Sequence, residues 1–370
     1  MEVDGEALRR NLRRVHEAAP GAAVLPMVKA DAYGLGAVAL LPLLAGGPPP
    51  AWGLGVAAVA EGEVLRAAGW TGRVVVFSPA PPGELDRAAD AGLTLALSEL
   101  ESVRRWAALA RATGRRLALH TEVDTGMGRA GFPCGEAASW GPAVAAAAAD
   151  LLEWEGCFTH FHSADEPDLA PTDEQQRRFR EALRFVPAGV RVVHSANSAA
   201  ALRRGGYGGD LVRPGIFLYG GRAGPGADPE PVAALRARIA LVRDVPAGWS
   251  CGYGATYRAG GPERWGTLSI GYGDGLPRAL GTAGGEALVG GRRVPIVGRI
   301  SMDVTVVDLT GVPAARPGDV ATLIGRDGDE EITVDEVAAR AGTISYEVLT
   351  GLAPRLPRLY RGGTPADGAA

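Results

Sequence analysis

Residues 93–124, LTLALSELESVRRWAALARATGRRLALHTEVD, set one helical run between two β-rich runs. The first and last segments, 93–98 and 116–124, are short apolar runs of the kind that forms buried strands. The middle segment carries apolar residues at helical spacing and runs into Gly114, a residue type that commonly ends helices. A strand, a helix and a second strand in this order predict a βαβ unit with parallel strands.

The same alternation extends from residue 22 to about residue 220. Eight β-rich runs occur there, in the order AVLPMVKA, WGLGVA, RVVVFSP, LTLALS, RLALHTEVD, LEWEGCFTHF, VRVVHSAN and LVRPGIFLYG. The segments between them have helical spacing, and PTDEQQRRFREALRFV, for example, predicts a helix with Thr172 as its N-cap. Eight strand–helix units in about 200 residues fit a closed (β/α)8 barrel better than an open doubly wound sheet.

The pattern changes after the Gly- and Pro-rich stretch GGRAGPGADPEP, residues 220–231. The runs that follow have turn signals and few helical spacings: RIALVRDV, GTLSIGY, RVPIVGRI, DVTVVDL and DVATLIG. A last helical segment, ITVDEVAARAGTISYEVLTGL, comes after them. The predicted fold class is therefore α/β, with an N-terminal (β/α)8 TIM-type barrel at residues 1–225 and a C-terminal, mainly antiparallel β domain at residues 226–370.

The composition is that of a soluble globular protein. The chain has 370 residues, 46% of them hydrophobic and 22% charged, and a net charge of −4 gives no reason to expect a nucleic-acid partner. No apolar run approaches the ~18 residues of a membrane helix, and residues 1–20 lack the apolar core of a signal peptide. We therefore expect a cytoplasmic protein with no membrane partner. Its three cysteines, Cys134, Cys157 and Cys251, are too few and too scattered for a disulfide framework or a zinc cluster.

Lysine occurs once, in PMVKADAYGLG at residues 26–36. The chain has 38 Lys plus Arg, so 38 − 1 leaves 37 arginines beside Lys29. Arginine stays protonated at any ordinary pH, whereas a lysine in an apolar pocket can lose its proton and form an imine with a carbonyl compound. Lys29 is therefore a candidate nucleophile, although chance in a chain that avoids lysine is the alternative.

Polar residues gather at the ends of the predicted barrel strands, where the active sites of such barrels lie. They are Lys29 and Asp31, then Glu122, Asp124 and Arg129, then His160 and His162, then Ser195, Asn197 and Ser198, and finally Arg213. The loops after strands seven and eight offer a phosphate site at Asn197-Ser198 and at 214–216. Phosphate together with an imine-forming lysine indicates pyridoxal 5'-phosphate, although a sugar-phosphate aldolase would fit the same pattern.

Nine motifs, in order along nearly the whole chain, match one family. They are VKADAYGLG, HTEVDTGMGRAGF, THFHSADE, HSANSAA, VRPGIFLYG, CGYGATY, GYGDG, VGRISMD and TISYEVLTGLAPRLPRLY. On these motifs the chain closely resembles alanine racemase. The resemblance implies interconversion of L-alanine and D-alanine on pyridoxal phosphate, a supply of D-alanine for peptidoglycan, and a homodimer with shared active sites.

The resemblance also assigns roles to residues. Lys29 would carry the cofactor and act as acid and base on one face of the substrate Cα, and Tyr253 of the other subunit would act on the opposite face. His160 and Arg213 would link Tyr253 to the cofactor, with Arg213 donating to the pyridine nitrogen. The phosphate-binding positions match Tyr33, Ser198, Gly215, Ile216 and Tyr346, and the substrate positions match Arg129, Met302, Tyr272 and Asp303.

One position departs from the family pattern. Many members have a lysine that becomes carbamylated seven residues before the arginine at position 129, and this chain has Glu122 there. Both groups are anions, so we predict a direct salt bridge from Glu122 to Arg129 and no modified residue. His162 also stands in a segment that often has no histidine at that point.

Four alternatives remain at this level. His160 and His162 lie one side-chain period apart on a strand end, as in some metal-dependent barrel hydrolases, which would need further ligands. A non-catalytic pyridoxal phosphate carrier would share the lysine-bearing barrel but would lack residues 232–360. A decarboxylase of the same two-domain plan would lack the CGYGATY and TISYE motifs. Within the racemase interpretation, a broader specificity that includes serine stays open, because apolar pockets discriminate weakly against an added hydroxyl.

Overall fold

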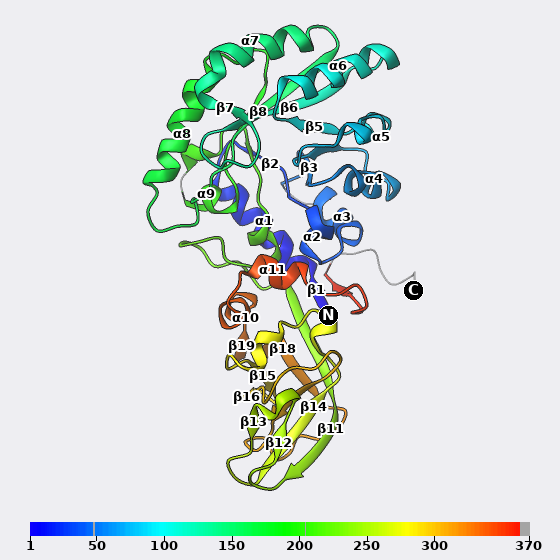
Figure 1. Ribbon diagram of the computed structural model, residues 1–370, viewed down its shortest axis with the longest axis vertical. Helices are drawn as coiled ribbons and strands as arrows, with labels where there is room; N and C mark the ends of the chain where they lie inside the picture. Colours follow the sequence, from blue (N-terminus) through cyan, green and yellow to red (C-terminus); the bar gives the residue numbers. More distant parts are fainter. Residues whose placement is uncertain (47–48, 204, 363–370) are drawn as a thin grey trace.

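The computed structural model describes residues 1–46, 49–203 and 205–362. A barrel with an outer layer of helices forms one part of the molecule, and an elongated β structure extends from it (Figure 1). Among the described residues, no helix is long and apolar enough to cross a membrane.

Eight parallel strands form the barrel. They are β2 (Ala23–Val24), β3 (Gly53–Val56), β4 (Arg73–Val76), β5 (Thr94–Leu97), β6 (Leu117–Asp124), β8 (Leu152–Phe158), β9 (Val192–His194) and β10 (Leu211–Val212). The strands from β3 to β9 pair in chain order, and β10 pairs with β2. Parallel bridges from Met27 to Gly55 and from Asn197 to Arg213 join these two groups into a ring. The predicted barrel and all eight of its strand runs are thus confirmed.

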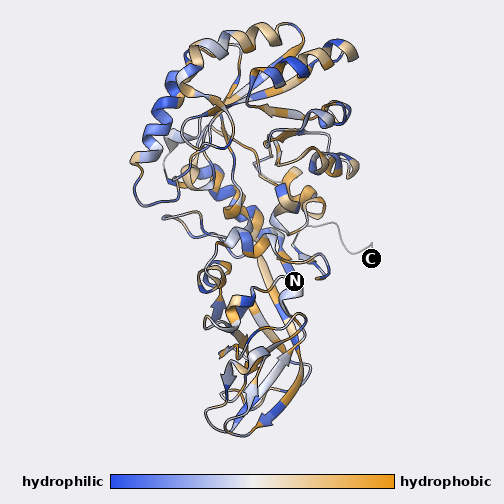
Figure 2. Ribbon diagram, viewed as in Figure 1, coloured by the Kyte–Doolittle hydropathy of each residue, from blue (hydrophilic) through white to orange (hydrophobic). Residues whose placement is uncertain are grey.

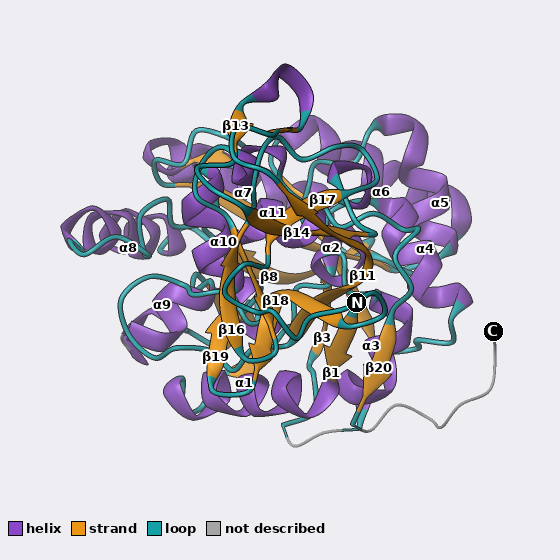
Figure 3. Cartoon of the chain, turned by 90° about the horizontal axis from the view of Figure 1, so that it is seen from below, coloured by secondary structure: helices purple, strands orange, loops and turns teal. Residues whose placement is uncertain are grey.

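Helices surround this ring, as the view from below shows (Figure 3). They are α1 (Gly5–Ala18), α3 (Ala37–Ala45), α4 (Val59–Ala67), α5 (Leu85–Asp90), α6 (Leu100–Thr113), α7 (Ala137–Ala148), α8 (Ala170–Leu183) and α9 (Ser198–Arg203). The short segment α2 (Lys29–Tyr33) lies at the mouth of the barrel and contains left-handed residues. Helices α3 and α7 are mostly hydrophobic, whereas α8 is largely hydrophilic (Figure 2). Helix α6 ends at Gly114, which has φ 66°, as its sequence predicts.

The predicted N-cap of α8 is wrong. The helix begins at Ala170, so that Thr172 lies inside it, fully buried. The carboxylate of Asp168 accepts the Ala170 N–H at 2.9 Å instead. Packing decides the difference, because Thr172 faces the barrel and an aspartate just ahead of the helix supplies the acceptor.

The second part is a mainly antiparallel sheet, as predicted. Its strands are β11 (Ala233–Val245), β14 (Glu263–Leu268), β15 (Glu286–Val289), β16 (Arg292–Pro295), β17 (Thr305–Asp308), β18 (Val320–Asp327), β19 (Glu330–Ile332) and β20 (Leu359–Arg361), together with β1 (Glu2–Asp4). A small hairpin, β12 (Ser250–Cys251) and β13 (Tyr257–Arg258), lies near its far end. The last helical segment is two helices, α10 (Val334–Ala341) and α11 (Ser345–Thr350), because Gly342 is left-handed and Ile344 is extended.

Strand β1 lies between β11 and β20. It pairs antiparallel with β11 through Glu2 and Ala234, and parallel with β20 through Glu2 and Leu359. The first residues of the chain therefore belong to the sheet of the second part, whereas the sequence division at 225/226 counts them with the barrel. That division stays a prediction.

Candidate active site

A cavity opens at the C-terminal ends of the barrel strands. Its lining residues are Met27, Lys29, Tyr33, Phe77, Glu122, Arg129, Phe158, His160, Asn197, Ser198, Arg213, Gly215, Ile216 and Tyr346. Eleven of these, all except Met27, Phe77 and Phe158, are residues that the sequence proposed for the site. They come from segments as distant as Lys29 and Tyr346, which the barrel and α11 bring to one place.

Lys29 lies half-buried at the cavity wall, on the segment that follows β2 and the Met27 bridge. Burial lowers the pKa of its amine, the cations of Arg129 and Arg213 lower it further, and only the carboxylate of Glu61 opposes them. A lowered pKa increases the neutral fraction of the amine, which is the nucleophilic form. The position thus suits the chemistry that the single lysine suggested.

The backbone after Lys29 forms a left-handed turn at residues 30–33, where all four residues have positive φ. The turn directs Tyr33 into the cavity, where its ring stacks on Tyr219 with centroids 4.8 Å apart. Across the cavity, an added Cβ on Gly215 would overlap the Tyr33 hydroxyl, so only glycine fits there. The Gly215 N–H donates to the Ser198 hydroxyl at 2.8 Å. Tyr33, Ser198 and Gly215 therefore form one polar cradle.

Arg213 occupies the floor of the site and is 4% exposed. Its Nη2 donates to the carbonyls of Thr159 and Ser195 at 2.9 and 3.2 Å, and lies 3.3 Å from Nδ1 of His160. Burial lowers the pKa of Arg213 to about 10, while Glu122 opposes that change, so the guanidinium remains a cation at neutral pH. Burial and the nearby cations lower the pKa of His160 to about 3, which keeps the imidazole neutral.

Two histidines that the sequence analysis did not single out lie behind Arg213. Nη1 of Arg213 is 2.7 Å from Nδ1 of His194, and Nε2 of His194 is 2.9 Å from Nδ1 of His120. Arginine can only donate, so Nδ1 of His194 accepts and its Nε2–H donates to His120. Both rings are fully buried, and burial lowers the pKa of each. Each of these histidines lies within a predicted strand run, so its inward-facing position on that strand could have identified it as a residue of the site.

Glu122 borders the cavity and is 3% exposed. Among the described residues, no direct ion pair joins Glu122 to Arg129, which contradicts the predicted salt bridge. The reason is local backbone: β6 ends at Asp124, and Gly126 and Gly128, both with positive φ, turn the chain so that Arg129 lies exposed at the rim. Burial raises the pKa of the Glu122 carboxyl, while Arg129 and Arg213 act in the opposite direction.

The remaining strand-end residues have structural partners. The Asp31 carboxylate accepts the Ala37 N–H at the start of α3 at 2.7 Å, and Asp124 accepts the N–H groups of Gly126 and Gly128. Asn197 accepts the Ala200 N–H in α9, and the Ser195 hydroxyl donates to the Tyr207 carbonyl. His162 is exposed and bonds to Ser163, whereas His160 faces Arg213, so the two rings do not form the ligand pair of a metal-dependent hydrolase.

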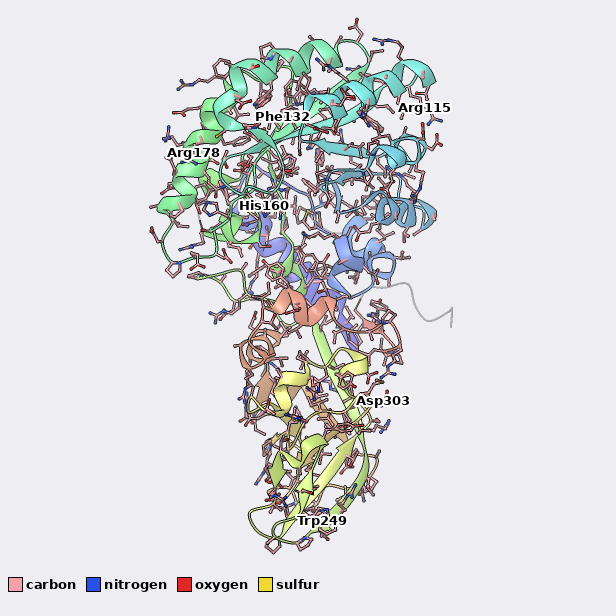
Figure 4. All side chains as sticks on the ribbon, viewed as in Figure 1. Arg115, Phe132, His160, Arg178, Trp249 and Asp303 are labelled. Atoms are coloured by element: carbon pink, nitrogen blue, oxygen red, sulfur yellow. The ribbon has the colours of Figure 1, made fainter. Side chains whose placement is uncertain are left out.

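Four predicted site residues do not reach the cavity of their own chain. Tyr253, Tyr272 and Met302 are 68%, 39% and 54% exposed in the β structure, and none of them lines the cavity. Asp303 accepts a hydrogen bond from Arg355 at 2.8 Å and lies well below His160 in the molecule (Figure 4). One copy of the chain thus brings together the barrel half of the predicted site and leaves the other half at its surface.

Comparisons with known proteins match both parts of the chain. The family description "Alanine racemase, N-terminal domain" matches residues 3–223, and "Alanine racemase, C-terminal domain" matches residues 232–360. An alanine racemase from Methylobacterium sp. is 41% identical over 97% of each chain.

Solved structures agree. The alanine racemase of a D-cycloserine-producing Streptomyces lavendulae superposes with a TM-score of 0.91 and 35% identity over 98% of this chain and 96% of that one. The alanine racemase of Bartonella henselae, solved with covalently bound pyridoxal phosphate, has a TM-score of 0.89 and 27% identity over 97% of this chain and 98% of that one.

Proposed function

The chain belongs to the alanine racemase family, and from this premise we propose that it interconverts L-alanine and D-alanine with pyridoxal 5'-phosphate as its cofactor. One observation supports the proposal most strongly: the only lysine of the chain lies in a cavity with Arg213 and the cradle of Tyr33, Ser198 and Gly215. Such a cavity has an amine, a fixed cation and a set of hydroxyl and backbone donors in one place.

The residues of the cavity fit this cofactor. The Lys29 amine would hold its aldehyde carbon, and Arg213 would donate to its ring nitrogen. The hydroxyls of Tyr33, Ser198 and Tyr346 and the N–H groups of Gly215 and Ile216 would hold its phosphate, in a space that a Cβ on Gly215 would fill. When bound, pyridoxal phosphate withdraws electrons from the substrate and makes its Cα proton removable.

Arg213 determines how strongly that withdrawal acts. Because a guanidinium keeps its proton, Arg213 would donate a hydrogen bond to the ring nitrogen without protonating it. Contacts with Thr159, Ser195 and His194 hold it in place. A weaker electron sink favours return of the proton to Cα, which is what racemisation requires.

Inversion at Cα needs a proton acceptor on one face and a donor on the other. Lys29, whose lowered pKa favours the neutral amine, would serve one face. Tyr253 would serve the other, and its exposed place in the β structure means that a second copy of the chain must supply it. The same copy would bring Tyr272, Met302 and Asp303. We therefore propose a homodimer with shared active sites.

The remaining assignments concern the substrate and the anion at position 122. Arg129, at the rim, would orient the substrate carboxylate, and His160 would bridge Tyr253 to Arg213. Glu122 would compensate the charges of Arg129 and Arg213 from a distance, in place of a carbamylated lysine. We also propose that the protein acts in the cytoplasm, where it supplies D-alanine for peptidoglycan, and that it prefers alanine to serine.

The test begins with the purified full-length protein. Its visible absorption should change on borohydride treatment, and mass spectrometry should place the reduced cofactor on Lys29. Circular dichroism should then follow the loss of optical rotation of L-alanine and, more slowly, of L-serine. The variant Lys29→Arg keeps the charge and should lose at least about 10⁴-fold in rate, because it lacks a titratable amine. A Lys29→Arg protein that still racemises alanine would exclude this function.

A further inference from the structure

The left-handed turn after Lys29 is unusual for its residues. Ala30, Asp31, Ala32 and Tyr33 have φ of 51°, 54°, 53° and 56°. In this region the Cβ of an L-residue lies too close to the following carbonyl oxygen, and residues other than glycine normally adopt it singly. A run of four therefore requires contacts from outside the turn that impose it.

One carboxylate supplies such a contact from the neighbouring helix. Glu61, in the first turn of α4, accepts the Ala30 N–H on Oε1 at 2.7 Å. Its other oxygen, Oε2, accepts the N–H groups of Ala57 and Ala58 at 2.7 and 3.3 Å. Both oxygens are engaged, one by the left-handed turn and the other by the segment ahead of α4.

Helix α4, which carries Glu61, is packed into the core. Its residues Val59 and Leu65 are fully buried in the core, and β3, which precedes it, is buried along its length. Glu61 thus connects the residue beside Lys29 to a helix that is packed into the core. At the other end of the turn, stacking on Tyr219 holds Tyr33.

We propose that Glu61 is a positioning residue for the proposed racemisation: by holding the Ala30 N–H it keeps the left-handed turn wound and so fixes how Lys29 and Tyr33 enter the cavity. This inference rests on the proposed function, because that reaction gives Lys29 and Tyr33 their roles. The Glu61 carboxylate has a second effect, since it opposes the lowering of the Lys29 pKa by burial and by Arg129.

The variant Glu61→Gln tests the bond with little change of shape. Glutamine has only one acceptor oxygen. Its NH2 group, which can only donate, must therefore face at least one of the three N–H groups that Glu61 accepts. A lost bond to a charged acceptor corresponds to about 10- to 100-fold, and we expect a fall of that size in kcat with a smaller change in KM for alanine. Glu63→Gln is the matched control, because Glu63 is in the same helix but pairs with Arg87 at the surface. It should stay within about twofold of wild type.

Two readouts do not depend on catalysis and separate this inference from the proposed function. In the full-length chain freed of cofactor, hydrogen exchange of a peptide spanning residues 29–36 should be at least about 10-fold faster in Glu61→Gln. Because Lys29 is the only lysine, its reaction with an amine reagent can be followed by mass spectrometry across pH. The midpoint should move to lower pH in Glu61→Gln and stay unchanged in Glu63→Gln. Both results can be read even if alanine proves not to be the substrate.

A double variant separates the turn from the stability of α4. Ser at position 58 is a good N-cap and should restore the start of α4 in a Glu61→Gln, Ala58→Ser protein, without replacing the bond to Ala30. The inference is supported if the melting temperature recovers while kcat and the exchange of residues 29–36 do not. It is overturned if all three recover together, or if Glu61→Gln alone keeps wild-type exchange and kcat.

Discussion

In the barrel, Arg213 is 4% exposed and its guanidinium bonds to two carbonyls and two imidazoles. In the β structure, Tyr253 is 68% exposed and lies outside the cavity. Both residues are proposed for the same active site. The barrel, together with Tyr346 of α11, builds its half within one chain, whereas the β strands and their loops only present the other half at the surface. The difference separates the half of the site that a single chain organises from the half that, in the proposed homodimer, a second copy would supply.

The largest expected effect tests the assembled half directly. Tyr253→Phe should lower racemisation about 10²- to 10⁴-fold, the usual contribution of one acid–base group. When the Tyr253→Phe protein is mixed with an equal amount of the Lys29→Arg protein and the subunits exchange, half of the dimers are hybrids. Each hybrid has one intact site. Activity should then return to about a quarter of the wild-type rate.

The control for that experiment is subunit exchange itself. Differently tagged copies, purified through both tags, show that hybrids have formed. Hybrids that remain inactive would mean that Lys29 and Tyr253 do not meet across an interface. The proposal that the β structure supplies half of the site would then be contradicted.

The next effect tests the half that one chain builds from its barrel and α11. Gly215→Ala would drive a Cβ into the Tyr33 hydroxyl, and overpacking of this kind costs about 1–3 kcal/mol. Affinity for pyridoxal phosphate should fall about 10- to 100-fold, measured by titration of the cofactor-free chain. Gly135→Ala, at a position where an added Cβ meets nothing, should bind as wild type does. Equal affinity in both variants would show that the cradle is not the phosphate site.

The buried histidines of the barrel should make the free energy of unfolding depend on pH. Burial lowers the pKa of His120, His160 and His194, so the folded barrel keeps them neutral while the unfolded chain protonates them below about pH 6.5. The free energy of unfolding should therefore fall with pH below that value, by up to about 1.4 kcal/mol per pH unit for each histidine. The raised pKa of Glu122 works in the opposite direction and reduces the total.

Urea unfolding at pH 7.5 and 5.5 measures this dependence. His120→Gln should reduce the slope of the unfolding free energy against pH by the contribution of one histidine. His162→Gln, which removes an exposed ring, should leave that slope unaltered. A slope that is the same in His120→Gln as in wild type would place the titration elsewhere.

The smallest effect concerns the rim of the cavity, where the two halves of the site would meet. Glu122→Gln removes the charge that faces Arg129 and Arg213 without a direct ion pair. We expect KM for alanine to rise up to about fivefold, the scale of a charge interaction with an exposed partner. Unaltered KM and kcat would remove Glu122 from the set of supporting residues.

Strand patterns allowed much of the barrel and its half of the site to be predicted. Eight apolar runs gave the strands, and polar residues at their ends gave Lys29, His160, Ser198 and Arg213, because parallel strands bring their ends to one mouth. Long-range contacts account for the rest. Strand β1 has only three residues and depends on partners at least 230 positions away (233 − 3 = 230). The left-handed turn could not be predicted, since Ala, Asp and Tyr do not favour positive φ and its bond comes from Glu61, 31 residues later.

The position of β1 has a consequence for how the chain is made. Strand β1 precedes the whole barrel in the sequence, yet its neighbours β11 and β20 end only at Val245 and Arg361. During synthesis β1 can pair with β11 once residue 245 has been made, whereas its other edge stays unpaired until β20 follows. The sheet around β1 is therefore completed in two steps, and β20 is the last strand that can join it.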